Sequence, residues 1–244
     1  MSESAPASDV SWRSIYILGG VSAVLVLGGT LFDIVLTSIP GWQASTVPTS
    51  VVLWLVQFEA TPLLGLRNLD LLNITVAVVG LPMYVALYGV HRRTRAGMAL
   101  AALVLVSVGT AVFVASNVAL PMLELGRQYA LASTDAQRLA IEGAATAMLA
   151  RGSHGSAGVF AGFLLPSLGT LLMMFAMIGG RVFKRAVGII GAAGTSLLLV
   201  YIVGTTFSHA SSGVLMGIAG IGGVMMIVWY VLVARTLFRM GANG

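Results

Sequence analysis

The sequence predicts an all-α protein, a polytopic transmembrane bundle of six membrane-spanning helices. The first observation is composition: 58% of the 244 residues are hydrophobic and only 9% are charged, whereas a soluble domain carries about 25% charged residues. The second is that the apolar residues fall into six runs, each close to the roughly 20 residues needed to cross a bilayer. A water-soluble fold of this size cannot bury so much apolar surface, so we expect lipid to surround the chain.

The predicted spans follow a short polar segment. Residues 1–14 are expected to form a disordered cytoplasmic tail, and residues 15–244 a single six-span transmembrane domain. We expect the spans at about 15–38, 71–91, 96–118, 157–180, 186–206 and 212–236. In the sixth span, Gly213, Gly217 and Gly220 recur at helical spacing, which predicts a closely packed seam.

Two long connections interrupt the spans. The first, residues 39–66, contains an apolar run too short to cross a bilayer, which we interpret as an amphipathic helix over about 50–60 lying on the membrane surface. The second, residues 120–152, follows the third span, which Pro121 is expected to end or kink. Within it, Thr134 and Gln137 have the spacing of a capping box, so a helix should begin there and run to about residue 150.

The basic residues predict the topology. Cations gather at the ends of alternate spans, and cytoplasmic loops of membrane proteins are enriched in lysine and arginine. Both termini are therefore expected to be cytoplasmic, with the two long connections and their helices on the outer face. Because the net charge of +5 follows topology, it does not predict nucleic-acid binding. The topology-setting cations are Arg92, Arg93, Arg95, Arg181, Lys184, Arg185, Arg235 and Arg239.

The sequence also contains a candidate internal repeat. Pro82 and Pro166 are 84 positions apart, and so are Arg67 and Arg151. Each proline lies near the middle of a predicted span that a basic turn follows. One hypothesis is a parallel repeat of helix pairs about an axis along the membrane normal. Identity between the copies is otherwise slight, so coincidence is the alternative.

Most of the unusual polar residues fall near the outer ends of the spans. Ionisable groups at membrane depth are costly and usually face a cavity or a partner. One interpretation is an outward-facing pocket for a small apolar or lipid-like molecule, floored by backbone carbonyls that the two prolines leave unpaired. The alternative is structural: the prolines shape packing, and the charged residues tie loops to helix ends. The candidate ligand-binding residues are Asp33, Arg67, Asp70, Asn73, Pro82, Arg151, His154, Pro166 and His209.

Two other classes of function stay open, so the sequence leaves undecided whether the protein is an enzyme. An intramembrane metal-dependent hydrolase would use His154, His209 and an aspartate, since catalytic zinc needs three protein ligands, but no HExxH spacing is present. A structural subunit of a membrane complex, or a homo-oligomer, would use the glycine seam. No motif for a phosphate, a dinucleotide or a nucleophilic triad occurs, so we predict no cofactor and no resident metal. The expected partners are membrane lipids and a small apolar ligand.

Three stretches carry a family resemblance: LGLRNLDLLNI at 64–74, LGRQYALASTDAQRLAIEGAATAML at 125–149 and IVWYVLVARTLFRMG at 227–241. Together they resemble an uncharacterised family of bacterial membrane proteins, domain of unknown function 4386. The most distinctive phrase is QYA followed by TDAQR. The resemblance implies a six-helix integral protein of the bacterial cytoplasmic (inner) membrane, and it implies no activity.

Overall fold

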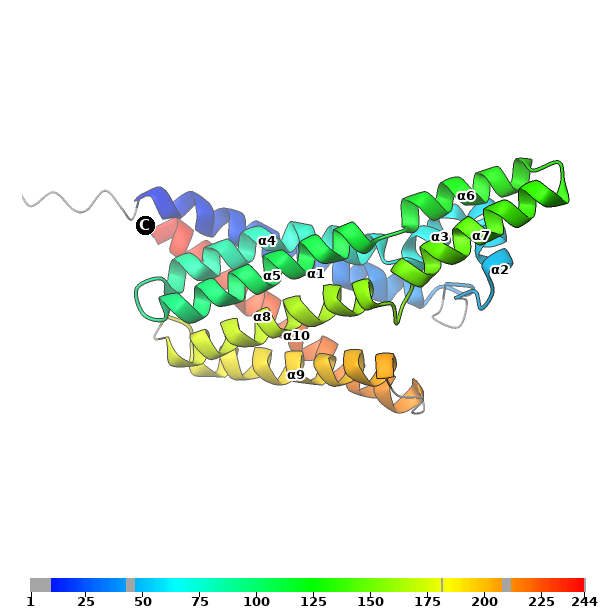
Figure 1. Ribbon diagram of the computed structural model, residues 1–244. Helices are drawn as coiled ribbons and strands as arrows, with labels where there is room; N and C mark the ends of the chain where they lie inside the picture. The colour runs from blue at the N-terminus through cyan, green and yellow to red at the C-terminus, as the bar shows by residue number, and fades with distance from the viewer. Residues whose placement is uncertain (1–9, 43–46, 181, 208–211, 244) are drawn as a thin grey trace, which may run out of the picture. The chain divides into compact units, whose positions relative to one another are not determined.

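The computed structural model describes residues 10–42, 47–180, 182–207 and 212–243, and every element in these ranges is a helix (Figure 1). The helices are α1 (Val10–Thr37), α2 (Val51–Ala60), α3 (Pro62–Asn68), α4 (Leu71–His91), α5 (Ala96–Ser116), α6 (Ala119–Leu131), α7 (Asp135–Gly152), α8 (Ala157–Gly179), α9 (Arg185–Phe207) and α10 (Ser212–Asn243).

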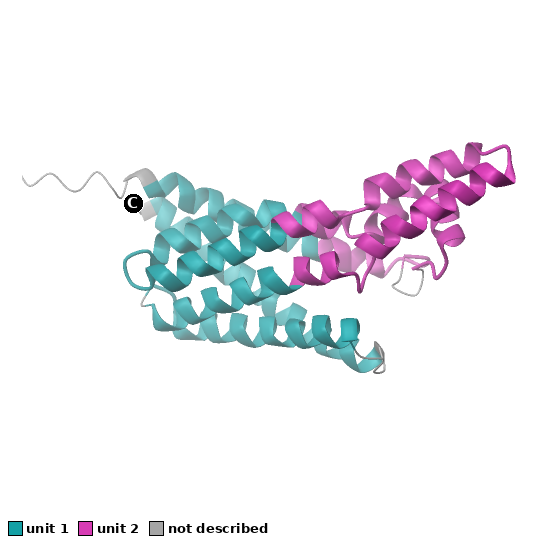
Figure 2. Cartoon of the chain, viewed as in Figure 1, with its two compact units in different colours: residues 1–30, 76–110, 164–244 teal, residues 31–75, 111–163 magenta. Residues whose placement is uncertain are grey.

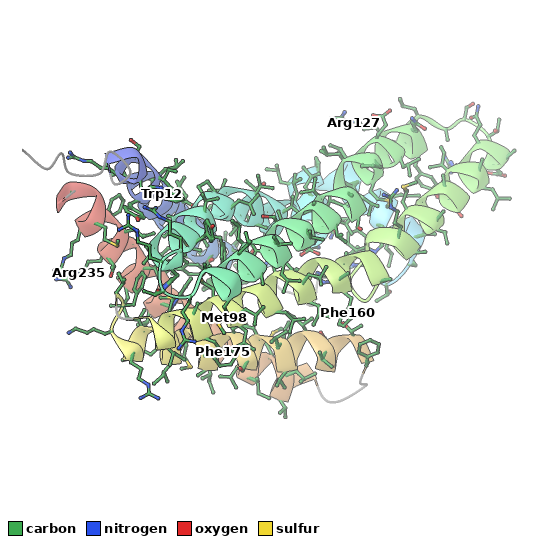
Figure 3. All side chains as sticks on the ribbon, turned by 60° about the vertical axis from the view of Figure 1, so that its left-hand side comes forward. Trp12, Met98, Arg127, Phe160, Phe175 and Arg235 are labelled. Atoms are coloured by element: carbon green, nitrogen blue, oxygen red, sulfur yellow. The ribbon has the colours of Figure 1, made fainter. Side chains whose placement is uncertain are left out.

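Six helical stretches of the described chain are long and apolar enough to cross a membrane, and they contain α1, α4, α5, α8, α9 and α10. The prediction of an all-α bundle with six spans is therefore confirmed. Large apolar side chains such as Phe175 on α8 are exposed, as expected of surfaces that lipid covers (Figure 3). Helix α1 begins at Val10 instead of residue 15, so the end of the expected tail is helical. Residues 1–9 of that tail lie outside the described residues.

The chain forms two compact units (Figure 2). Unit 1 comprises residues 1–30, 76–110 and 164–244, and unit 2 comprises residues 31–75 and 111–163. Helices α9 and α10 belong to unit 1, and α2, α3, α6 and α7 belong to unit 2. Each of α1, α4, α5 and α8 contributes one part to each unit.

Within unit 1, α9 and α10 approach each other at a pair of glycines. A Cβ atom on Gly222 would lie 3.0 Å from the carbonyl oxygen of Gly194, so neither position has room for a side chain. The seam predicted on α10 is different: a Cβ atom added to Gly213, Gly217 or Gly220 would meet nothing within 4 Å among the described atoms. Successive helical residues turn by about 100°, which places Gly222 on the opposite face of α10 from those three, so the predicted seam is not used within the described residues and its use in a complex stays a prediction.

Unit 2 has its own apolar core, in which Phe58 of α2 is the central side chain. It is buried with Trp54 and Leu55 of the same helix. Cβ atoms added to Gly65 of α3 and Gly126 of α6 would lie 2.8 Å and 2.7 Å from Phe58 atoms, so two glycines give this ring its space. The helix predicted to lie on the membrane surface therefore exists, with the face carrying these three side chains covered by protein.

Helix α6 was not predicted, because Pro121 was interpreted as a helix breaker. The chain breaks earlier, at Asn117 and Val118, and α6 begins at Ala119. Pro121 then falls in the first turn of α6, where its missing N–H leaves no hydrogen bond unmade. The following helix, α7, begins as predicted: Thr134 and Gln137 form both hydrogen bonds of the capping box.

Candidate functional site

The polar candidates of unit 2 are organised by the short junction between α3 and α4. Pro62 opens α3 in a position that suits proline. At the other end of α3, Asp70 has a left-handed φ of +63°. Helix α4 begins at the next residue. The junction leaves Arg67, in the last turn of α3, six positions before Asn73 in the first turn of α4.

Arg67 joins α3 to the end of α1. Its Nε donates a hydrogen bond to Oδ1 of Asp33 at 3.0 Å, and its Nη1 donates to the backbone carbonyl of Trp42 at 2.9 Å. Its Nη2 makes no hydrogen bond within the described residues. The side chain of Arg67 is 13% exposed and that of Asp33 is 34% exposed. The two side chains thus differ in exposure: the cation is nearly buried, whereas the anion is partly open to its surroundings.

Asp70 is the most buried charged group of the site, with 3% of its side chain exposed. Its Oδ1 accepts a hydrogen bond from Nδ2 of Asn73 at 2.7 Å. Its Oδ2 accepts no hydrogen bond from the described residues, and its neighbour is Nε2 of His154 at 3.4 Å. The histidine is 59% exposed, so the buried carboxylate has an accessible partner.

Burial raises the pKa of Asp70 above its ordinary value of 3.8. A carboxylate removed from water is disfavoured relative to the neutral acid. The charge of Asp33 acts in the same direction, whereas His154, Asn73 and Arg67 act against it. These electrostatic influences mean that the Asp33–Arg67 and Asp70–His154 pairs form one polar cluster, which brings five of the nine predicted site residues together.

An apolar groove of about 390 Å³ lies beside Arg67, wholly within unit 2. Pockets for small ligands usually measure about 300–1,000 Å³ and combine apolar walls with a few polar groups, and this groove fits that description. Arg67 is the one charged residue among its described lining residues. The groove is lined by Phe32, Leu36, Trp42, Leu63, Leu66, Arg67, Leu71, Leu72 and Thr75.

A second cavity of unit 2, about 320 Å³, lies beside His154. Two of its polar side chains are engaged inside the fold. Ser50 caps α2 by accepting a hydrogen bond from the N–H of Leu53, and Asn68 donates to Gln57 at 3.2 Å. The lining of this cavity is richer in polar side chains than that of the groove beside Arg67, so it suits an apolar chain less well.

Arg151 serves a different purpose from Arg67. Its Nη2 donates to the carbonyl of Ala115 at 2.6 Å, near the end of α5. A cation there pairs with carbonyls that have no partner within their own helix. Asn117 makes a similar tie in the same unit, since its Nδ2 donates to the carbonyl of Leu69 at 2.6 Å. For Arg151 the contacts match the structural alternative, here as a link between the last turn of α7 and the end of α5.

Pro82 lies inside α4, in unit 1, and Ser22 of α1 meets the break that it makes. The Ser22 hydroxyl donates to the carbonyl of Val79 and accepts from the N–H of Met83 at 3.3 Å. In a regular helix those two backbone groups would bond to each other, and here the Ser22 hydroxyl contacts both of them. Polar groups freed near a proline can be satisfied in this way by a neighbouring helix. These contacts assign the turn around Pro82 to helix packing.

Pro166 lies inside α8, and its ring packs against Gly109 of α5, also in unit 1. A Cβ atom on Gly109 would lie 2.3 Å from Cδ of Pro166. The glycine therefore accommodates the proline ring, which again is a packing contact. His209, the remaining candidate, lies outside the described residues.

A metal centre would need at least three converging ligands. Among the residues that the structure describes, no three His, Cys, Asp or Glu side chains gather in this way. Asp70 and His154 form only a pair. The hydrolase hypothesis therefore depends on His209 and stays a prediction.

Sequence analysis missed two features of these sites. It did not find the apolar lining of the groove, because α3 was taken for part of a loop; Pro62 followed by a leucine-rich segment was the available signal. It also did not find Ser22 as the partner of the turn around Pro82. No local pattern points to that pairing, since the two residues are 60 positions apart.

The six apolar stretches and the helical unit with its charged cluster define a multi-pass α-helical membrane protein. No protein-family model matches the chain, and no curated protein sequence matches it. No solved structure matches it either.

Proposed function

We propose that this protein binds a small lipid-like molecule in the groove of unit 2, as a non-enzymatic binding or transport protein of the bacterial inner membrane. The observation that carries the proposal is the groove itself: eight uncharged, mostly apolar side chains and one nearly buried arginine surround about 390 Å³. Burying an alkyl chain gains about 0.8 kcal/mol per methylene group. A molecule with an apolar chain and a polar head therefore suits both parts of the lining.

We further propose that the groove faces outward. Helix α4 contains 21 residues, about 31 Å at 1.5 Å per residue, which is enough to cross the hydrocarbon core. Its last residue is followed by Arg92, Arg93 and Arg95, which favour the cytoplasmic side. The junction with α3 lies at the opposite end of α4, and so do Arg67 and the groove. In this orientation both termini are cytoplasmic.

Fluorescence quenching tests the proposal, because Trp42 lines the groove. The purified full-length protein in detergent is titrated with the methyl ester of a brominated fatty acid, whose bromine atoms quench nearby tryptophans. We expect saturable quenching that disappears in Trp42→Phe. This variant keeps the backbone carbonyl that binds Arg67, so the charged pair is retained.

A matched pair of variants shows whether the groove is the site. Thr75 lines the groove, and Thr75→Phe should fill part of it and weaken saturable quenching. Val78 is exposed on the same helix and does not line the groove, so Val78→Phe should leave quenching unchanged. Quenching that does not saturate, or that is the same in Trp42→Phe and Thr75→Phe as in the wild type, would contradict the proposal.

A further inference from the structure

The Asp33–Arg67 pair has a feature that a purely structural salt bridge does not require. Arg67 is 13% exposed and lines the groove, whereas Asp33 is 34% exposed and does not line it. A nearly buried cation needs an anion beside it at all times, because an unpaired buried charge is strongly disfavoured. A carboxylate that is one-third exposed can instead be hydrated when its partner leaves.

The pair also leaves much of the guanidinium unused. Asp33 accepts one hydrogen bond, from Nε, and Trp42 accepts one, from Nη1. Arginine binds a carboxylate best through two parallel N–H groups. Since Nη2 makes no hydrogen bond within the described residues, an incoming carboxylate can form a two-point contact that Asp33 does not make.

From this geometry we infer that the groove binds a single-chain amphiphile with a carboxylate head, and that the head replaces Asp33 on Arg67. The inference rests on the proposed function, because the alkyl chain must occupy the same groove. Asp33 acts as a built-in competitor that neutralises Arg67 while the groove is empty. The head then neutralises Arg67 in place of Asp33, and the displaced Asp33 carboxylate, one-third exposed, carries its charge where it can be hydrated. A doubly charged phosphate head would need a second cation, and the described lining residues supply none.

The test compares a brominated fatty acid with its methyl ester at a pH at which the acid is ionised, using the same full-length protein and the Trp42 signal. The two probes differ only in the charge and hydrogen bonding of the head. The acid should bind about tenfold more tightly than the ester, a factor that corresponds to about 1.4 kcal/mol and to one charge-assisted hydrogen bond.

Substitutions separate the two partners. Arg67→Gln should reduce acid binding to the level of the ester. Arg67→Lys keeps the charge but lacks the two-point geometry, so it should retain only part of the preference for the acid over the ester. Asp33→Asn removes the competitor and should tighten acid binding by several-fold without changing ester binding. Arg127, a 66% exposed arginine on α6 (Figure 3), is the control, and Arg127→Gln should change neither.

The outcomes distinguish this inference from the proposed function. If neither probe shows saturable binding to the wild type, both are wrong. If acid and ester bind equally, and Arg67→Gln and Asp33→Asn change nothing, only the carboxylate inference is wrong. Tighter binding of a brominated single-chain alkyl phosphate than of the fatty acid would overturn the choice of a carboxylate head. If Asp33→Asn does not fold, the comparison of the wild type with Arg67→Lys still tests the carboxylate inference.

Discussion

Replacing Asp70 by alanine should destabilise unit 2 more than replacing it by asparagine. The residue has a φ of +63°, where a Cβ atom costs about 1–2 kcal/mol and where asparagine and aspartate are tolerated best. Asparagine also keeps an acceptor for the Nδ2 group of Asn73, 2.7 Å away in the wild type. Alanine loses that hydrogen bond, worth about 1 kcal/mol. The alanine variant should therefore be less stable than the asparagine variant by about 1–3 kcal/mol.

Thermal unfolding in detergent measures this difference. Trp54 is buried in the core of unit 2, so its fluorescence reports on this unit. Asp70→Gly is the control, because glycine lacks the Cβ atom and relieves the left-handed strain; it should be at least as stable as Asp70→Ala. If Asp70→Ala unfolds at the same temperature as Asp70→Asn, the left-handed conformation assigned to Asp70 between α3 and α4 is wrong.

The same variants test the protonation of Asp70. Burial raises its pKa in the folded protein above 3.8, so the folded state holds this proton more tightly than the unfolded chain does. The stability that the wild type gains from the protonated acid is complete below about pH 3.8 and is lost as the pH rises through the higher folded value. Asp70→Asn does not titrate and should not show this loss. Equal pH dependence of the two proteins in that window would contradict the assignment.

Two further predictions concern packing. Phe58→Ala should destabilise unit 2 by about 3–5 kcal/mol, because it empties the space between two glycines. Leu53→Ala, at an exposed position on the same helix, is the control and should cost far less. Denaturant unfolding measures both losses, and similar values would argue against the described core. Ser22→Ala should destabilise unit 1 by about 1 kcal/mol because two backbone groups near Pro82 lose their partner. The control is Thr30→Ala, because the Thr30 hydroxyl bonds to a carbonyl of its own helix. If the two substitutions lower stability equally in the same assay, Ser22 has no special role at Pro82.

Much of the fold follows from local sequence. The bounds of α4 and the capping box of α7 agree with expectation because apolar run length and cap spacing are short-range properties. Helix α6 was missed because a proline can break a helix or begin one. Which of the two occurs depends on Asn117, whose side chain accepts a hydrogen bond from the N–H of Ala119 and donates to the carbonyl of Leu69. The contact between Asn117 and Leu69 joins residues 48 positions apart, so the sequence around Pro121 does not predict it.

The candidate site was predicted in part. The sequence predicts that Arg67 and Asp33 lie at the same depth in the membrane, and depth alone made them candidates for the same site. The structure adds that the cation is the more buried partner and that an apolar groove lies beside it. Neither fact follows from spacing, because both depend on how residues of α1, α3 and α4 come together around the groove. The family resemblance, the internal repeat and the role as a subunit of a complex stay predictions.

Photochemical labelling tests the central claim most directly. A fatty acid with a diazirine on its chain is irradiated with the full-length protein in detergent, and the labelled peptides are mapped. The account predicts adducts concentrated at residues 32–36, 63–66 and 71–75, which contribute to the groove, and their loss in Thr75→Phe. Adducts spread over exposed apolar faces, such as residues 214–231 of α10, and unchanged in Thr75→Phe would show that the probe only coats the protein surface and would contradict the account.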